Sequence, residues 1–156
     1  MKDISNSLRI VRVARANYLK MIQAYSLEAL NFIPEGFSNN IIWNFGHVIA
    51  TQQLLTYALS GLPTPMDEKL IGKYRKGTRP TDAVSQSELN ELVSLATSLI
   101  DQFEKDYNAN LFQNYKVYKT SFGHEIISID DAVEFNNLHE GMHFGTCIDI
   151  RRFINE

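Results

Sequence analysis

The chain has 156 residues, of which 44% are hydrophobic and 21% are charged, and its formal net charge is −3. This length suits one domain with its own core, so we expect a single domain over residues 1–156. The acidic balance argues against a nucleic-acid partner. No apolar run is long enough to cross a bilayer, so we expect no membrane partner. The single cysteine, Cys147, cannot form an internal disulfide, and no signal peptide is recognisable, which favours the cytoplasm.

The first half of the chain predicts two helices and a long connection. Apolar spacing indicates a first helix over about residues 4–30, which Pro34 prevents from continuing. A second helix follows residues 38–40, all good N-cap types, and stops at Ser60-Gly61. Residues 61–84 then form a connection with five basic residues, which we interpret as a solvated loop or, alternatively, as an anion-steering rim over an active site: Lys69, Lys73, Arg75, Lys76 and Arg79.

The second half predicts two further helices. Ser85 and Glu88 form a capping box before a long amphipathic pattern, the third helix. A stretch rich in β-branched and aromatic residues around Gly123 then predicts a short hairpin or extended crossover. Ser128 begins a fourth helix that runs from about residue 130 to 153. The expected fold is therefore all-α: a four-helix bundle with a short strand-like crossover before the last helix.

The segment HEGMH, residues 139–143, carries the most specific chemistry in the chain. His139 and His143 lie one helical turn apart, so both imidazoles can reach one metal ion. The segment also fits the H-E-x-x-H pattern of zinc proteases, in which the glutamate is the general base. Those proteases take a third ligand from downstream, and the few residues after His143 offer no suitable one. We therefore reject the protease interpretation.

An upstream histidine is the better third ligand. His47 lies midway along the second helix in apolar surroundings, so it should face the core. Gly46 before it costs helix stability, which is tolerable if metal access or close helix packing needs the space. Neighbouring apolar residues on the fourth helix, among them Leu138 and Met142, indicate that the histidine pair also points inward. Three histidines could then meet inside the bundle.

Two segments carry a family resemblance: NNIIWNFGHVIATQQLL and LHEGMHFGTCIDIRRF. Both resemble the DinB/YfiT-like superfamily, and the likeness extends from about Ser5 to Phe153. The resemblance implies a four-helix bundle with a divalent ion, zinc or nickel being the expected metals, held by His47, His139 and His143. It also implies a metal-dependent enzyme, because relatives include bacillithiol S-transferases and thiol-dependent isomerases. Its partners would be a small-molecule thiol and an electrophilic substrate, and a homodimer is common in the family.

The residues around the predicted site have open roles. Glu140 could be an acid–base group or a partner of a ligating histidine, but its angular offset from His139 favours a structural or surface role. Asn44 could orient a ligand or substrate, so Glu140 and Asn44 are the two catalytic candidates. Cys147 could be a fourth ligand or a nucleophile, although buried packing is the more usual role. His124, beside Gly123 in a turn, is expected at the surface.

The predicted site allows more than one function. Three neutral imidazoles leave the full charge of the ion in place, and a thiol bound to it would be deprotonated. The ion could equally activate water, so it is the family resemblance that makes a thiol S-transferase the expected function. The alternatives are a metal-dependent hydrolase at the same site and a bundle that binds metal without catalysing a reaction.

Overall fold

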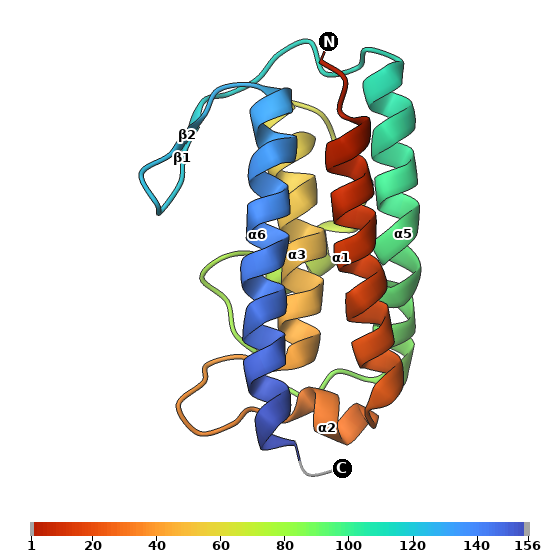
Figure 1. Cartoon of the computed structure of the whole chain (residues 1–156), viewed down its shortest axis with the longest axis vertical. Helices are drawn as coiled ribbons and strands as arrows, with labels where there is room; N and C mark the ends of the chain where they lie inside the picture. The colour runs from red at the N-terminus through yellow and green to blue at the C-terminus, as the bar shows by residue number, and fades with distance from the viewer. Residues whose placement is uncertain (1, 155–156) are drawn as a thin grey trace.

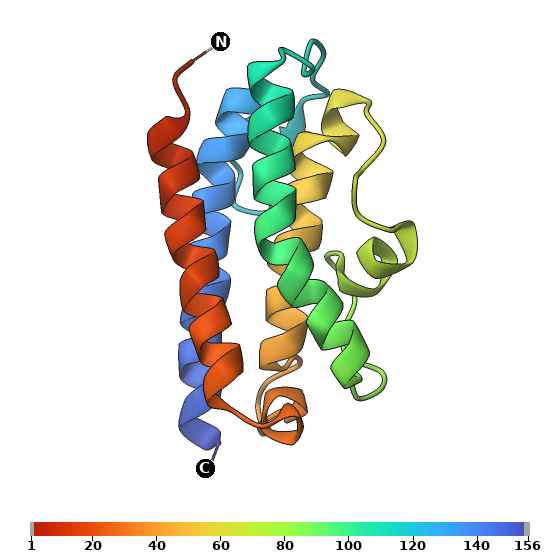
Figure 2. The same cartoon turned by 90° about the vertical axis from the view of Figure 1, so that its right-hand side faces the viewer.

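The computed structural model describes residues 2–154, which fold as an all-α four-helix bundle. Its long helices run side by side along the long axis of the molecule (Figures 1 and 2). They are α1 (Ser5–Ala24), α3 (Ile41–Thr56), α5 (Gln86–Asn108) and α6 (Ile129–Ile150). The shorter elements are α2 (Leu27–Asn31), η1 (Ala58–Ser60), α4 (Glu68–Tyr74) and η2 (Arg151–Phe153), with strands β1 (Tyr118–Lys119) and β2 (Glu125–Ile126).

Side-chain caps fix the starts of the three later bundle helices. The side chains of Asn40, Ser85 and Ser128 each accept a hydrogen bond from a backbone N–H in the first turn of the helix that follows. The predicted starts of these helices are thus confirmed. The predicted capping box at Ser85 is only half formed, because the carboxylate of Glu88 bonds instead to Lys73 and Tyr74.

The predicted first helix, residues 4–30, is wrong in its continuity. It ends at Ala24, and the extended residues Tyr25 and Ser26 separate it from α2. The Ser26 hydroxyl caps α2 by accepting from the N–H of Ala29, so a second helix start lies within the predicted one. The prediction of an unstructured connection over residues 61–84 is also wrong in part, because this segment contains the helix α4.

Helix α3 is the central helix of the bundle and is buried on almost every side. It packs against α6, α5 and α4, and α6 also packs against α1 (Figures 1 and 2). The main apolar cluster joins residues of α1, α3, α4, α5 and α6, including Tyr18, Phe45, Ile49, Tyr74 and Leu92. Burial of this apolar surface is the main force that holds the helices together.

The predicted crossover before the last helix is a two-stranded antiparallel hairpin. Tyr118 pairs with Ile126 and Lys119 with Glu125, and Gly123 has a positive φ in the turn. The hairpin projects from the bundle beside α6 (Figure 1). Its turn reaches that helix, because the rings of Phe122 and His124 both lie against Phe135. This placement makes the hairpin one wall of the cavity described below.

Candidate metal centre

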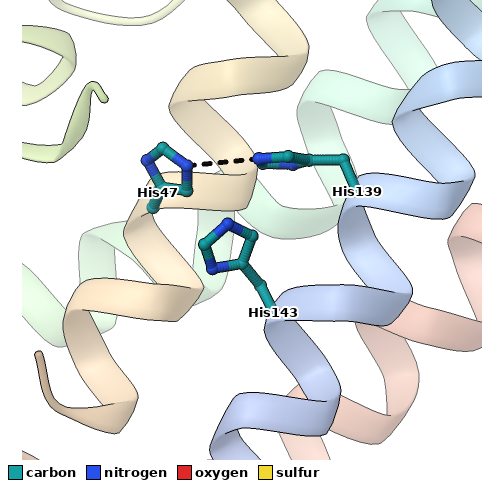
Figure 3. A group of neighbouring side chains, drawn as sticks. All are labelled: His47, His139 and His143. Carbon is teal, nitrogen blue, oxygen red and sulfur yellow. Dashed lines mark hydrogen bonds between the residues drawn. The ribbon is translucent and has the colours of Figure 1, made fainter. Parts of the chain in front are cut away.

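The three predicted histidines come together between α3 and α6. His47 projects from α3 and His139 and His143 project from successive turns of α6, as Figure 3 shows. One nitrogen from each ring lies within 4.8 Å of a nitrogen of the other two. The Nε2 atoms of His47 and His139 are 3.2 Å apart. Within residues 2–154 this is the only cluster of three or more histidine, cysteine or acidic side chains with the spacing of a metal site.

His47 is fixed by a backbone carbonyl and by an aromatic ring. Its Nδ1 lies 2.7 Å from the carbonyl oxygen of Tyr74. A carbonyl can only accept, so Nδ1 carries the ring proton and donates it, and the lone pair is on Nε2. The indole of Trp43 stacks on the imidazole with ring centroids 4.6 Å apart. His47 therefore presents a free Nε2 lone pair to the other two histidines.

Gly46 allows this carbonyl to come close. A Cβ at this position would lie 2.5 Å from the ring of Tyr74, nearer than atoms can approach. Only glycine lets α4 pack this tightly against α3, and the same packing brings the Tyr74 carbonyl to His47. The two sequence-based explanations of Gly46, close packing and access for a metal, thus describe one arrangement.

His143 is oriented by Asn44. The side-chain oxygen of Asn44 lies 2.7 Å from Nδ1 of His143. The amide nitrogen of Asn44 donates to the carbonyl of Asn40, which fixes the oxygen toward the histidine. His143 Nδ1 is therefore also a donor, and its Nε2 lone pair is free. Asn44, a catalytic candidate from the sequence, lies where it orients a ring of the cluster.

His139 differs from the other two histidines. Its Nδ1 is buried without a hydrogen-bond partner among residues 2–154. Without a ligand, Nε2 of His139 can donate to Nε2 of His47, but the buried Nδ1 of His139 then stays unpaired, which costs free energy. A cation shared by the rings would instead be bound by the lone pairs that converge here. The donor set thus fits a divalent metal ion.

Burial keeps the three imidazoles neutral. Loss of solvent lowers the pKa of His143 to about 4 and, together with the neighbouring histidines, lowers that of His139 to about 2. Burial also lowers the pKa of His47, and the charge of Lys76 acts in the same direction. A neutral imidazole is the form that binds metal, so the site is ready to bind an ion at neutral pH.

Glu140 lies next to the histidines in sequence but points toward Arg15 of α1 and not into the histidine cluster. Its carboxylate is fully buried and pairs with the fully buried guanidinium of Arg15 at 2.6 Å. Both Nε and a terminal nitrogen of Arg15 donate to it. The surface role considered from the sequence is wrong, because no part of this side chain is exposed. With its carboxylate held by Arg15, Glu140 is not placed as the general base that the H-E-x-x-H pattern requires.

The remaining candidates lie outside the cluster. Cys147 is fully buried in the apolar core and does not belong to the cluster of potential ligands, and burial raises the pKa of its thiol to about 12, which disfavours a nucleophilic thiolate. His124 is exposed on the hairpin turn. Leu138 is 58% exposed, so the expectation that it shares the inward face of the histidines is wrong, whereas Met142 lines the cavity beside them.

The histidines open into a cavity of about 500 Å³ between α3, α6 and the hairpin. Its walls include Trp43, Thr51 and Leu55 of α3 and Phe135 of α6. The Thr51 hydroxyl lies 3.4 Å from Nε2 of His47, so a polar group stands beside the cluster. A small molecule can therefore reach the three imidazoles.

Three histidines that converge from facing helices beside a cavity are typical of helical-bundle proteins that bind metal. A family model described as the DinB superfamily matches residues 10–147, and the chain belongs to this superfamily. Comparison with curated proteins gave no significant match. Membership and the cluster together indicate a divalent metal site. None of the described helices is long and apolar enough to span a membrane.

Proposed function

We propose that this protein is a metal-dependent thiol S-transferase in which His47, His139 and His143 hold a divalent ion. The observation that supports this most directly is the pair of fixed imidazoles: Tyr74 and Asn44 hold the Nδ1 protons, so two Nε2 lone pairs converge. A divalent ion bound there would supply a Lewis acid that lowers the pKa of a coordinated thiol and yields a thiolate at neutral pH.

The side chains near the cluster suit thiol transfer better than hydrolysis. Metal-dependent hydrolases commonly use a carboxylate base that takes the proton of the attacking water, and within residues 2–154 no aspartate or glutamate lines the cavity. Glu140 is held by Arg15. A thiol is more acidic than water, so at the ion it would release its proton to solvent with less help from a base. The apolar walls would exclude water and hold an electrophile beside the thiolate.

The first test is the metal content of the purified protein. We expect one divalent ion per chain, zinc or nickel, measured by elemental analysis, and its loss in His47→Ala and His143→Ala. His124→Ala is the matched control, because this histidine lies on the exposed turn of the hairpin and should leave the metal content unchanged. Full retention of the ion in both cluster variants would exclude the proposed site.

The second test is conjugation. Purified protein is given a panel of small thiols with monochlorobimane as the electrophile, and product fluorescence is followed with and without added metal. Metal-dependent conjugation, lost in His143→Ala and retained in His124→Ala, would support a transferase. A protein that binds the ion and is stabilised by it, but conjugates none of the thiols, would instead be a bundle that keeps metal without catalysis.

A further inference from the structure

The cavity extends well beyond the histidines. Along α3 its wall continues from His47 to Leu55, and then to Leu59 after the helix ends. Eight residues separate His47 from Leu55, which corresponds to about 12 Å along the helix axis. The cavity thus has room for an organic molecule that extends well beyond the three histidines.

The side chains along this extension are mainly apolar. They come from α3, from α6 and from the hairpin, so three separate elements enclose the same space. A ligand that fills it must present an apolar body to these walls. The apolar lining residues that matter here are Leu54, Leu55, Leu59, Phe122, Phe135 and Met142.

The charge of the lining is of one sign. Among residues 2–154, Lys76 and Lys116 are the only charged side chains that line the cavity, and no acidic residue lines it. Neither lysine belongs to the ion pairs found within residues 2–154. Of the five basic residues in the connection after η1, Lys76 alone lines the cavity, whereas Lys73 pairs with Glu88.

The two lysines approach the cavity from different segments. Lys76 follows Tyr74, whose carbonyl binds His47, so it lies near the metal centre. Lys116 lies near the far end of α3, since its backbone N–H donates to the carbonyl of Leu59 at 2.7 Å. Cations near both ends of an apolar cavity raise its electrostatic potential throughout, and apolar walls strengthen that field.

We propose that this cavity selects an amphipathic anion, with an apolar body against the leucine, phenylalanine and methionine walls and a negative group recognised by Lys76 and Lys116. A neutral apolar molecule would gain the same burial but no charge attraction, and a cation would be repelled. The inference rests on the proposed function only in treating this ligand as a substrate. Binding itself needs no turnover, so the two can fail separately.

A matched pair of fluorescent probes tests the charge preference on the protein as purified. Anilinonaphthalene sulfonate has an apolar body and one negative charge, and N-phenylnaphthylamine has the same aromatic body without the sulfonate. We expect tighter binding of the sulfonate, with an affinity that falls as salt is added, and no such salt dependence for the neutral probe. Equal affinities at low salt would overturn the proposal.

Variants that remove charges then test which residues cause the preference for the sulfonate probe. In Lys76→Gln/Lys116→Gln we expect the sulfonate to bind about fivefold more weakly and the neutral probe to bind as before. Arg79→Gln is the control, because it removes an exposed charge from the same connection outside the cavity lining. A double variant that keeps the full preference for the sulfonate would refute recognition by these lysines.

Filling variants show which cavity the probes enter. Ala58 is exposed and lines the cavity, so Ala58→Trp should block both probes without disturbing the core. Ala83→Trp fills a separate apolar groove near α2 and should leave both affinities unchanged. The opposite result would place binding at that groove and reject the proposal. Absence of conjugation by the unaltered protein, with probe selectivity intact, would reject only the transferase function.

Discussion

Arg15 of α1 and Glu140 of α6 form an ion pair in which neither side chain has any exposed surface. The remaining donors of Arg15 reach the carbonyls of Val48 on α3 and Ala96 on α5. The guanidinium of this α1 residue therefore contacts the other three long helices of the bundle. The pair also holds α6 at the residue next to His139, so it helps to fix the position of the histidine cluster.

We expect Arg15→Met to lower the free energy of unfolding by about 3–5 kcal/mol, because it leaves the carboxylate of Glu140 buried without a partner. The double variant Arg15→Met/Glu140→Met should be less destabilised than the single one, since no isolated charge remains. Arg12→Met is the control: its partners Asp101 and Glu104 are exposed, and the expected loss is about 0–1 kcal/mol. Denaturant titration measures all three. A double variant less stable than Arg15→Met would contradict this account.

Gly46→Ala should reduce metal retention. Its methyl group would push the ring of Tyr74 away and take the carbonyl that holds His47 with it. Losing the partner of a ligating histidine typically costs about 10–100-fold in metal affinity. The affinity is measured by competition with a chromophoric chelator. Gly141→Ala is the control, because a Cβ there meets no atom within 4 Å. Equal affinity in the two variants would show that the close contact is irrelevant to the ion.

Asn44→Leu should weaken metal binding by a similar factor, about 10–100-fold, because His143 would lose the acceptor that fixes its Nδ1 proton. Asn44→Asp keeps an oxygen at the same place and should retain most of the affinity. The same chelator competition measures both. If the aspartate variant were as weak as the leucine variant, the oxygen of Asn44 would not be the group that matters.

The metal-free protein should become less stable as the pH falls from 7 to about 5. His143 has a pKa of about 4 when folded and an ordinary value of 6.5 when unfolded. Between these values the unfolded chain binds more protons, so the stability present above pH 6.5 is lost toward pH 4. Thermal unfolding after chelation measures this. His143→Gln should show a smaller decrease, and an equal decrease in both proteins would argue against His143 as the source.

Cys147 should be unreactive in the folded protein. The thiol is completely buried, and burial raises its pKa to about 12, so little thiolate forms at neutral pH. A chromogenic disulfide reagent should react slowly with the native chain and rapidly after addition of guanidinium. Cys147→Ala should keep its metal, which elemental analysis can measure. Fast native labelling, or loss of metal in that variant, would restore Cys147 as a candidate for the site.

Features that depend on local sequence could be predicted from the chain alone. The cap residues Asn40, Ser85 and Ser128 placed three helix starts correctly, because a cap acts within one turn. The three histidines were also identified, since helical spacing and the family resemblance both indicate them. The structure brings these three together between α3 and α6.

Features that depend on distant contacts could not be predicted. The oxygen of Tyr74 that orients His47 is a backbone carbonyl, and because every residue has one, the residue type at this position does not reveal the contact. The break at Ser26 was missed because the apolar pattern continues through it to Leu30. The Arg15–Glu140 pair joins residues far apart in the chain. An arginine within an apolar helix face was the one indication of it, since a buried guanidinium needs an acidic partner.

The segment that follows α4 contributes to two properties of the molecule at once. Tyr74 supplies the carbonyl that orients His47 of the candidate metal centre, and Lys76, two residues later, supplies a charge at the cavity. Substitutions or insertions in this segment would therefore change both the ligand preference of the cavity and the affinity for a metal ion. Divergence toward new chemistry in this protein is therefore easier through the hairpin, whose residues shape the same space without supporting any histidine of the cluster.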